Sequence, residues 1–263
     1  MVAAQRRLLA AEPGIAERTA YEGMGEGGDR SLRLDRRSED IVFGELERLH
    51  EGGLDFLAIS EERGEVGFGR AGGLVVVIDP IDGSLNARRT IPAYSLSLAL
   101  ASGPFLADVE LAFVHDFGTE EEFTARRGGG AYLGQRRLDA TGPGYGLEVV
   151  GIEAAKPERV VHVAKALSGH AFRLRSVGSI AISVCWIAAG RFDGMLTTRP
   201  CRSVDIAAAQ LIAREAGAEI RIGGFDLDAA PLSLDARYQA VCALEPGMLD
   251  PLLTALRAVE EGE

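Results

Sequence analysis

The chain has 263 residues, 47% of them hydrophobic, and a formal net charge of -11 at pH 7. This length and apolar content suit one large globular domain or two fused lobes, and an acid excess without a clustered basic stripe argues against direct binding of nucleic acid. The three cysteines have no CxxC spacing and no run of about 18 apolar residues occurs, so we expect a cytoplasmic protein with neither a disulfide framework nor a membrane span.

Two helical segments are expected ahead of the first long strand. Residues 3–22 have helical composition interrupted by a Pro-Gly pair, and a glycine-rich loop should follow at 23–30. Apolar residues at helical spacing predict a second helix over 35–49. Asp35 or Ser38 could cap its start, which would place Asp35 at the positive end of the helix.

The rest of the first half has the pattern of a strand-rich, antiparallel lobe. Leu74 to Ile78 is apolar at every position, which is typical of a central strand covered on both faces. Glycines should form a turn before it, at 64–73. Further strands are expected at 54–59, 94–101, 109–115, 122–125 and 131–133.

The pattern changes to alternating strands and helices near residue 142. We take this point as the boundary between an amino-terminal lobe, 1–142, and a carboxyl-terminal α/β lobe, 143–263. In the second lobe we expect strands at 148–152, 172–174 and 219–222, and helices at 157–167, 179–189, 204–215 and 247–260.

The most informative segment is Asp79-Pro80-Ile81-Asp82-Gly83-Ser84, directly after the apolar strand. Proline forces the residue before it into an extended conformation, and open α/β sheets bind ligands at the carboxyl ends of their strands. Gly83 and Ser84 would begin a helix whose free N–H groups face the two acids, so a phosphate held between metal ions and amides fits the segment. For the isolated Asp-x-x-Asp-Gly pattern, a turn with a helix cap is an equal alternative.

The longer string from Leu74 to Asn86 resembles the signature of the inositol monophosphatase family, within the lithium-sensitive, Mg²⁺-dependent sugar-phosphate phosphatases. A second block resembles the carboxyl-terminal signature of that family: Gly178-Ser179, Asp193, Ser203 to Ala208 and Glu215 to Gly217. The resemblance runs in the expected order from about residue 23 to residue 217. It implies a five-layered α-β-α-β-α sandwich of the sugar-phosphatase type, of α+β or α/β class, a homodimer, and competition by Li⁺ for a Mg²⁺ site.

The resemblance also implies a set of site residues. The metal ligands would be the carboxylates of Glu61, Asp79, Asp82 and Asp205 and the carbonyl of Ile81, holding two or three Mg²⁺ ions or Mn²⁺. Asp35, Glu61 and the Ser84 hydroxyl would orient the attacking water, and no covalent phosphoenzyme would form. The substrate would contact Asp82, Gly83, Ser84, Arg175, Ser179, Ile180 and Arg199.

The chain departs from the family pattern in several places. Ser60 precedes the ligand glutamate, where a glycine is usual, and Val204 replaces a tryptophan. The stretches 25–35 and 199–205 resemble archaeal-type enzymes described as both fructose-1,6-bisphosphatase and inositol monophosphatase. Those enzymes hold substrate with an arginine seven residues before the last metal aspartate.

Here that position is Thr198, so the contact could come from Thr198, Arg199 or Arg202. Arg175 and Arg202 could also be surface ion pairs, which are common.

Together these features predict a cytoplasmic Mg²⁺-dependent phosphomonoesterase that acts on a small polyol or sugar phosphate, with inositol-1-phosphate and fructose-1,6-bisphosphate as first candidates. One alternative is a nucleotidase for 3'-phosphoadenosine-5'-phosphate. Another is a regulatory binding protein of the same fold, since some bacterial members of the family bind the transcription machinery. We expect no direct nucleic-acid ligand and no membrane partner.

Overall fold

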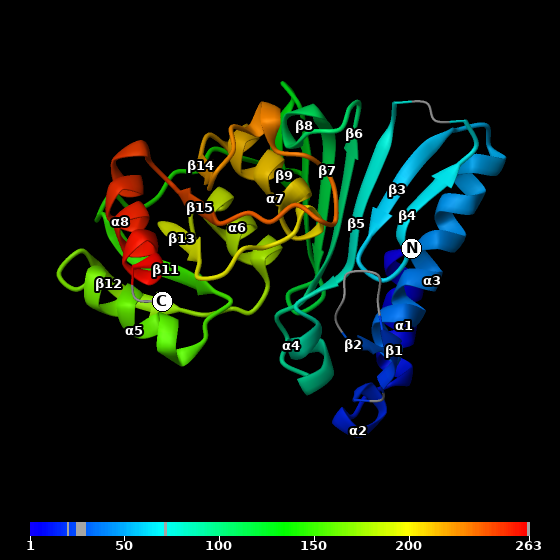
Figure 1. The fold of residues 1–263 in the computed structure, drawn as a ribbon, viewed down its shortest axis with the longest axis horizontal. Coiled ribbons are helices and arrows are strands. Elements are labelled where there is room, and N and C mark those ends of the chain that lie inside the picture. Colours follow the sequence, from blue (N-terminus) through cyan, green and yellow to red (C-terminus); the bar gives the residue numbers. More distant parts are fainter. Residues whose placement is uncertain (20, 25–29, 71–72, 262–263) are drawn as a thin grey trace.

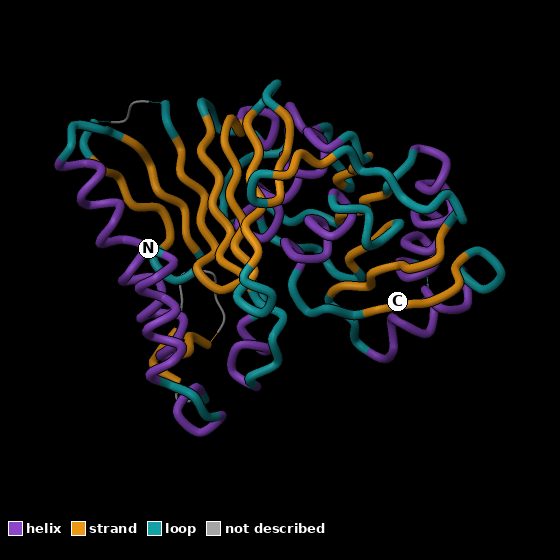
Figure 2. The backbone as a smooth tube through the Cα atoms, turned by 180° about the vertical axis from the view of Figure 1, so that it is seen from behind, coloured by secondary structure: helices purple, strands orange, loops and turns teal. Residues whose placement is uncertain are grey.

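The computed structural model describes residues 1–19, 21–24, 30–70 and 73–261. Its elements stack in five layers, α-β-α-β-α, as the resemblance implied (Figures 1 and 2). Helices α6 (Ile180–Ala188) and α7 (Ser203–Ala216) form the central layer and contact a sheet on either side. The outer layers are α1 with α3 at one end and α5 with α8 at the other.

The eight-stranded sheet has the order β10-β9-β8-β7-β6-β5-β3-β4. All neighbouring strands are antiparallel except β3 and β5, which run parallel, so the prediction of an antiparallel lobe was wrong for that pair. The edge strand β4 forms a hairpin with β3, and the chain then crosses to the other side of β3. The bounds are β3 (Phe56–Ser60), β4 (Gly64–Phe68), β5 (Val75–Asp82), β6 (Ser95–Ala101), β7 (Val109–Asp116), β8 (Glu121–Arg126), β9 (Gly130–Leu133) and β10 (Arg136–Leu138).

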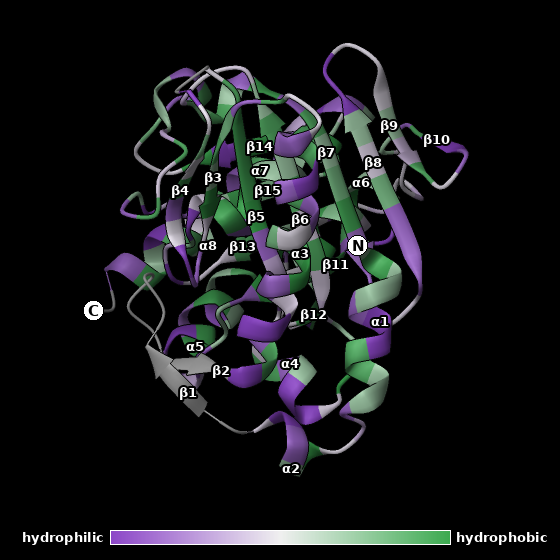
Figure 3. Ribbon diagram, turned by 90° about the vertical axis from the view of Figure 1, so that its right-hand side faces the viewer, coloured by the Kyte–Doolittle hydropathy of each residue, from purple (hydrophilic) through white to green (hydrophobic). Residues whose placement is uncertain are grey.

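Helices α1 (Val2–Ala11) and α3 (Arg33–Glu51) cover the outer face of this sheet, with α3 polar on its solvent side (Figure 3). The predicted helix over 35–49 is confirmed but begins at Arg33, so neither proposed residue caps it. Asp35 lies in the first turn instead, and the buried Ser38 accepts a hydrogen bond of 2.6 Å from Gln5 Nε2.

The first predicted helix breaks near its Pro-Gly pair into α1 and the short α2 (Ile15–Arg18). Its expected last residues lie instead in β1 (Tyr21–Met24), which pairs with β2 (Arg30–Leu32) in a small separate sheet. The predicted loop at 23–30 therefore overlaps both strands, and its residues 25–29 lie outside the described residues.

The five-stranded sheet has the order β12-β11-β13-β15-β14. Strand β11 is parallel to β12 and β13, whereas β15 is antiparallel to β13 and β14. Its bounds are β11 (Leu147–Glu153), β12 (Ala171–Arg175), β13 (Gly194–Thr197), β14 (Glu219–Ile222) and β15 (Ala240–Ala243). Its outer face carries α5 (Pro157–Ala166) and α8 (Leu249–Glu260), and short 3-10 turns lie at Leu106–Asp108, Leu227–Ala229 and Pro246–Met248.

Among the described residues, six strands escaped prediction: β1 and β2 of the small sheet, and β4, β10, β13 and β15. The glycines at 64–73 predicted only a turn, but Gly64 and Gly67 pair with β3 at the sheet edge, where the ladder offsets their weak strand propensity. Strands β13 and β15 are each four buried residues long, too short for periodicity to assign them to strand or helix.

The buried core is continuous between the two sheets, and a second hydrophobic cluster lies under α1 and α3. The chain passes from the first sheet to the second between Leu138 and Leu147, and a lobe boundary at residue 142 stays a prediction. Within the described part of the chain, no helix is both long and apolar enough to span a membrane.

Strand β5 reaches further than predicted, because it continues through Asp82 rather than ending at Ile78. Its pairing register with β6 shifts between Asp79 and Asp82. Pro80 lies in this irregular stretch, where the missing N–H of a proline breaks no regular ladder. Helix α4 (Ser84–Arg89) then begins where predicted, after Gly83 at φ +93°.

Gly178 lies against Asn86 where the two halves of the molecule meet. The Asn86 side-chain amide donates hydrogen bonds of 2.7 Å to the carbonyls of Ala93 and Val177, which come from the two halves. Gly178 has a φ of +84°, and a Cβ there would lie 2.7 Å from Asn86 Nδ2. Glycine is therefore required both by the backbone and by the close approach.

Gly178→Ala should lower the free energy of unfolding more than Gly169→Ala, a matched control at φ +82° where an added Cβ would meet no atom within 4 Å. Both substitutions introduce the strain of a left-handed alanine, about 1 kcal/mol. The clash with Asn86 should add about 1 kcal/mol or more to the first alone. Urea unfolding of the two variants measures the difference, and equal losses would contradict the interpretation.

Candidate metal centre and adjoining cleft

Three carboxylates from three different elements meet at one edge of the eight-stranded sheet. Glu61 directly follows β3, Asp79 belongs to β5, and Asp205 lies in the first turn of α7. Because β3 and β5 are parallel, with Ser60 paired to Ile78, their carboxyl ends place Glu61 beside Asp79. One oxygen from each of the three carboxylates lies within 4.8 Å of the others.

The electrostatics of this cluster are unfavourable without a cation. Burial raises the pKa of Asp79 well above its ordinary value, and the neighbouring carboxylates of Asp82, Glu61 and Asp205 raise it further. Burial likewise raises the pKa of Asp82 and of Asp205 to about 6 each. Buried like charges disfavour their ionised forms, and a donor set made only of oxygens fits a hard divalent cation such as Mg²⁺.

Short-range hydrogen bonds fix the turn that carries the motif. The Asp79 carboxylate accepts a hydrogen bond of 2.9 Å from the backbone N–H of Ile81. The Ser84 hydroxyl donates to the Ile81 carbonyl, also at 2.9 Å. Hydrogen bonds within the protein thus connect Asp79, Ile81 and Ser84, three of the predicted site residues.

Asp82 is held by the opposite half of the molecule. Its Oδ2 accepts hydrogen bonds from the Ser179 hydroxyl at 2.5 Å and from the Ala181 N–H at 2.8 Å. Ser179 is also the N-cap of α6, accepting from the Ile182 N–H at 3.2 Å. The predicted substrate residue Ser179 therefore positions Asp82 and caps a helix in this structure.

The predicted arginines lie in different surroundings. Arg202 donates from Nη1 to Glu61 at 2.6 Å and from its backbone N–H to Asp205 at 2.7 Å, and its side chain is 16% exposed. It is therefore a partly buried neighbour of the carboxylate cluster rather than a surface ion pair. Arg175 is exposed and donates to the carbonyl of the adjacent Leu174 at 3.0 Å.

Two further predicted positions, Thr198 and Asp35, are not members of the three-carboxylate group. Thr198 is fully buried, and its hydroxyl donates to the Ala154 carbonyl at 2.6 Å, which directs it away from any ligand. Asp35 is partly buried in the first turn of α3, and the three-carboxylate group found among the described residues does not include it.

A cleft of about 530 Å³ adjoins the carboxylates and lies between the two halves of the molecule. Asp82 and Asn86 line it from the first half, and Ile180 and Asp205 from the central helices. Gly178 lines it too, and the loops after β11 and β13 contribute Lys156 and Arg199. The cleft therefore has Asp82 and Asp205 on one side, and Lys156 and Arg199 next to Glu153 on the side of the other sheet.

Glu153 lines this cleft, although it was not among the site residues predicted from the sequence. The side chain is 1% exposed and accepts from the Val177 N–H at 3.1 Å, the Gly178 N–H at 2.8 Å and the Ser183 hydroxyl at 2.6 Å. Burial raises its pKa. An acid directly after an apolar strand was the available signal, the same one that singled out Asp79.

Ser60, the departure from the family glycine, has a structural role next to Glu61. Its hydroxyl donates to the buried Glu39 carboxylate, and Arg63 Nε lies 3.5 Å from the other Glu39 oxygen. Burial raises the pKa of Glu39 to about 7, while the Ser60 hydrogen bond and the Arg63 charge oppose that rise. The pair connects α3 to the loop that carries Glu61.

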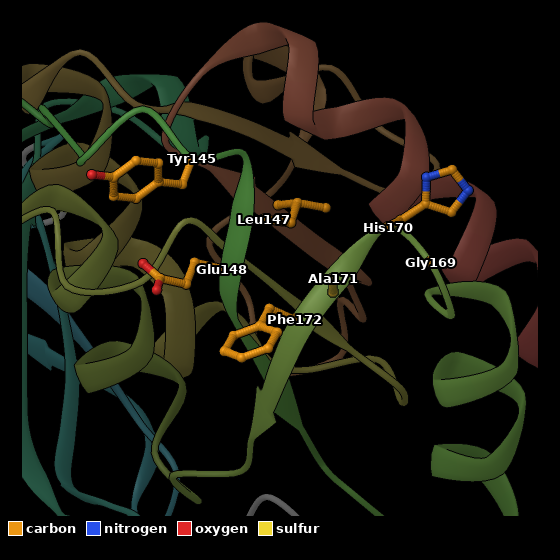
Figure 4. A pocket seen from close by; sticks show the side chains of 7 residues that line it. All are labelled: Tyr145, Leu147, Glu148, Gly169, His170, Ala171 and Phe172. Carbon is orange, nitrogen blue, oxygen red and sulfur yellow. The ribbon is translucent and has the colours of Figure 1, made fainter.

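A second cavity, of about 380 Å³, lies at the start of β11 and β12 (Figure 4). Tyr145, Leu147 and Glu148 approach it from the β11 side, and His170 and Phe172 from the β12 side. Among the described residues that line this cavity, only Glu148 carries a carboxylate. The cavity therefore lacks the group of carboxylates found at the first site.

Comparison with known proteins gives one consistent family. A model of the inositol monophosphatase family matches residues 8–258. The chain is 30% identical over 252 residues to a fructose-1,6-bisphosphatase/inositol-1-monophosphatase of Archaeoglobus fulgidus, covering 93% of this chain and 92% of the relative. It is 33% identical over 202 residues to an inositol-1-monophosphatase of Mesorhizobium japonicum, covering 72% and 71%. A solved inositol monophosphatase-fructose 1,6-bisphosphatase matches with a TM-score of 0.82 at 26% identity, covering 95% of this chain and 94% of that one.

Glu39→Gln should change the pH dependence of stability. Since the folded-state pKa of Glu39 is about 7 against an ordinary 4.5, the contribution of this group to stability is full below about pH 4.5 and is lost as the pH rises through 7. A neutral glutamine escapes that loss, which approaches about 3 kcal/mol. The Tm of Glu39→Gln relative to the unsubstituted protein should therefore rise between pH 5 and pH 8, measured without metal.

The matched control is Glu47→Gln, an exposed glutamate on the same helix, which should show no such pH trend. Parallel Tm curves for Glu39→Gln and the unsubstituted protein across this range would contradict the assignment.

Proposed function

This chain belongs to the inositol monophosphatase family, and we propose that it is a Mg²⁺-dependent phosphomonoesterase that hydrolyses inositol-1-phosphate, fructose-1,6-bisphosphate or both. The observation that carries the proposal is the cluster of Glu61, Asp79 and Asp205 beside a cleft between the two halves of the molecule. The names of the relatives, which include both activities, support the substrate class.

In this proposal the carboxylates of Glu61, Asp79, Asp82 and Asp205, with the Ile81 carbonyl, hold two or three divalent ions, Mg²⁺ or Mn²⁺. When bound, such ions neutralise the buried carboxylates, stabilise negative charge on a phosphate and lower the pKa of a bound water. The Asp82 carboxylate is already oriented by Ser179 and Ala181, so little rearrangement is required of it.

The catalytic roles in this proposal are those that the family resemblance implies for Asp35, Glu61 and Ser84. Asp35, Glu61 and the Ser84 hydroxyl would orient the attacking water, and the phosphate would lie over Gly83 and Ser84. The water oxygen would bond to phosphorus and give up a proton, the ester P–O bond would break, and the departing alkoxide oxygen would take up a proton, which yields inorganic phosphate and the free alcohol. The organic part of the substrate would contact Arg175, Ser179, Ile180 and Arg199, of which Ile180 and Arg199 line the cleft.

Neither alternative function gains support from a specific observation. A purely regulatory binding protein would not need a buried carboxylate cluster whose members raise one another's pKa. Family membership supports three further parts of our proposal: inhibition by Li⁺, assembly as a homodimer and a cytoplasmic location.

Asp79→Asn should abolish phosphate release, by about 10³-fold or more, because it removes a central oxygen charge while keeping the shape of the side chain. The same variant should raise the Tm of the metal-free protein at pH 8, since one buried like charge is gone. A chelator should abolish the activity of the unsubstituted protein, and Mg²⁺ should restore it.

The control is Asp250→Asn, an exposed aspartate in the first turn of α8, which should leave activity unchanged and should not raise the Tm, since its charge favours the helix N-terminus. Full activity in Asp79→Asn, measured as phosphate released from either substrate, would refute the metal site.

A further inference from the structure

We propose that Lys156 is a specificity-determining residue that, together with Arg199, binds a second phosphate of the substrate, so that this chain prefers a sugar bisphosphate to a monophosphate. The inference rests on the proposed function, because the first phosphate is taken to lie at the carboxylate cluster. It adds a residue that no sequence motif pointed to.

The position of Lys156 follows from the parallel pairing of two strands. Glu153 at the end of β11 pairs with Thr197 at the end of β13, so the loops that follow these strands leave the same edge of the sheet. Lys156 follows three residues after the first, and Arg199 two residues after the second. Both line the cleft that Asp82 and Asp205 also line. One cleft therefore joins the carboxylates to two basic side chains.

The backbone beneath these side chains is fixed although the side chains are exposed. The Thr198 N–H donates to the Glu153 carbonyl at 2.9 Å, its hydroxyl donates to the Ala154 carbonyl at 2.6 Å, and the Lys156 N–H donates to the same carbonyl at 2.9 Å. Ala154 has a φ of +55°, a left-handed conformation that costs a non-glycine residue about 1 kcal/mol. Backbone strain of this kind persists where neighbouring contacts impose it, and it clusters at ligand sites.

The charges leave a place for an anion. Across the described part of the chain, no hydrogen bond or ion pair engages the Lys156 ammonium or the Arg199 guanidinium. Glu153, the acid at the end of β11, also lines the cleft, but its oxygens accept three hydrogen bonds from Val177, Gly178 and Ser183. A phosphate would supply the missing partner, with the lysine acting as a point charge and the arginine as a planar fork.

The cleft favours a sugar over a nucleotide as the carrier of that phosphate. Among its described lining residues none is aromatic, and the apolar ones are small or aliphatic, such as Ala154, Ala155 and Ile180. An adenine ring would find no stacking surface there. Polyol hydroxyls, in contrast, can use the exposed backbone of the loops.

The kinetic test compares two lysine variants. Lys156→Met should lower the ratio of kcat/KM for fructose-1,6-bisphosphate to that for inositol-1-phosphate by about tenfold, the loss expected for one charge-assisted contact. Lys165→Met is the matched control, because Lys156 and Lys165 are the two lysines of the chain, and it should leave the ratio unchanged. An unchanged ratio in Lys156→Met would overturn the inference.

A second measurement does not depend on turnover. Reductive methylation with formaldehyde modifies both lysines, and mass spectrometry reports each separately. With Mg²⁺ and short pulses, fructose-1,6-bisphosphate should slow modification of Lys156 about fivefold or more and leave Lys165 unaffected, while inositol-1-phosphate should protect neither. Equal modification with and without the bisphosphate, or protection by 3'-phosphoadenosine-5'-phosphate alone, would overturn the sugar-bisphosphate assignment. Protection of Lys156 without release of phosphate would support the second site and refute the phosphatase activity, which separates the two failures.

Discussion

The rest of the structure depends on the burial of several negative charges at the carboxyl ends of β3 and β5. Asp79, Asp82 and Asp205 all have raised pKa values, chiefly because burial removes their hydration. Protein donors compensate in part: N–H groups of α6 and of the motif turn, the Ser179 hydroxyl, and Arg202 beside Glu61. These donors fix the orientation of the carboxylates but leave them repelling one another. A bound divalent cation would relieve the remaining repulsion, so the same geometry that weakens the metal-free fold would favour metal binding.

This cluster forms only when the two halves of the chain pack accurately against each other. Hydrogen bonds and glycines at their junction hold the halves in that position. Asp82 from β5 accepts hydrogen bonds from the start of α6, and Asn86 from α4 donates to a carbonyl in the loop before α6. That loop is in turn held from behind by Glu153. Gly83 and Gly178 allow the backbones to approach, since a Cβ on Gly83 would lie 3.0 Å from the Gly178 carbonyl oxygen. Asp82, a proposed metal ligand, is therefore joined by hydrogen bonds to the contact between the two halves and to the wall of the cleft.

The sequence predicted the carboxylate motif better than the residues that hold it in place. Two carboxylates at the end of an apolar strand, with a glycine and a serine next, were sufficient to locate the motif, and parallel β3 and β5 bring Glu61 to it. The parallel pairing itself was missed, because β4 is a glycine-containing edge strand without an apolar pattern. Roles that depend on contacts between residues distant in the chain could not be predicted either. Ser179 could not be seen to hold Asp82, nor Ser60 to hold Glu39, since each partner is distant in the chain.

One side of the cleft carries buried carboxylates and the other carries exposed basic side chains. This difference in burial bears on how the proposed substrate choice is encoded. The carboxylate side consists of buried groups whose replacement disturbs packing, hydrogen bonding and charge together. Lys156 and Arg199, on the other side, are exposed side chains on loops whose backbone is fixed by Thr198 and Ala154. Exchanging such a side chain alters the charge offered to a substrate without disturbing the core beneath. The proposed chemistry of the site is thus tied to the fold, whereas the proposed selectivity resides in two exposed side chains that the fold only has to present.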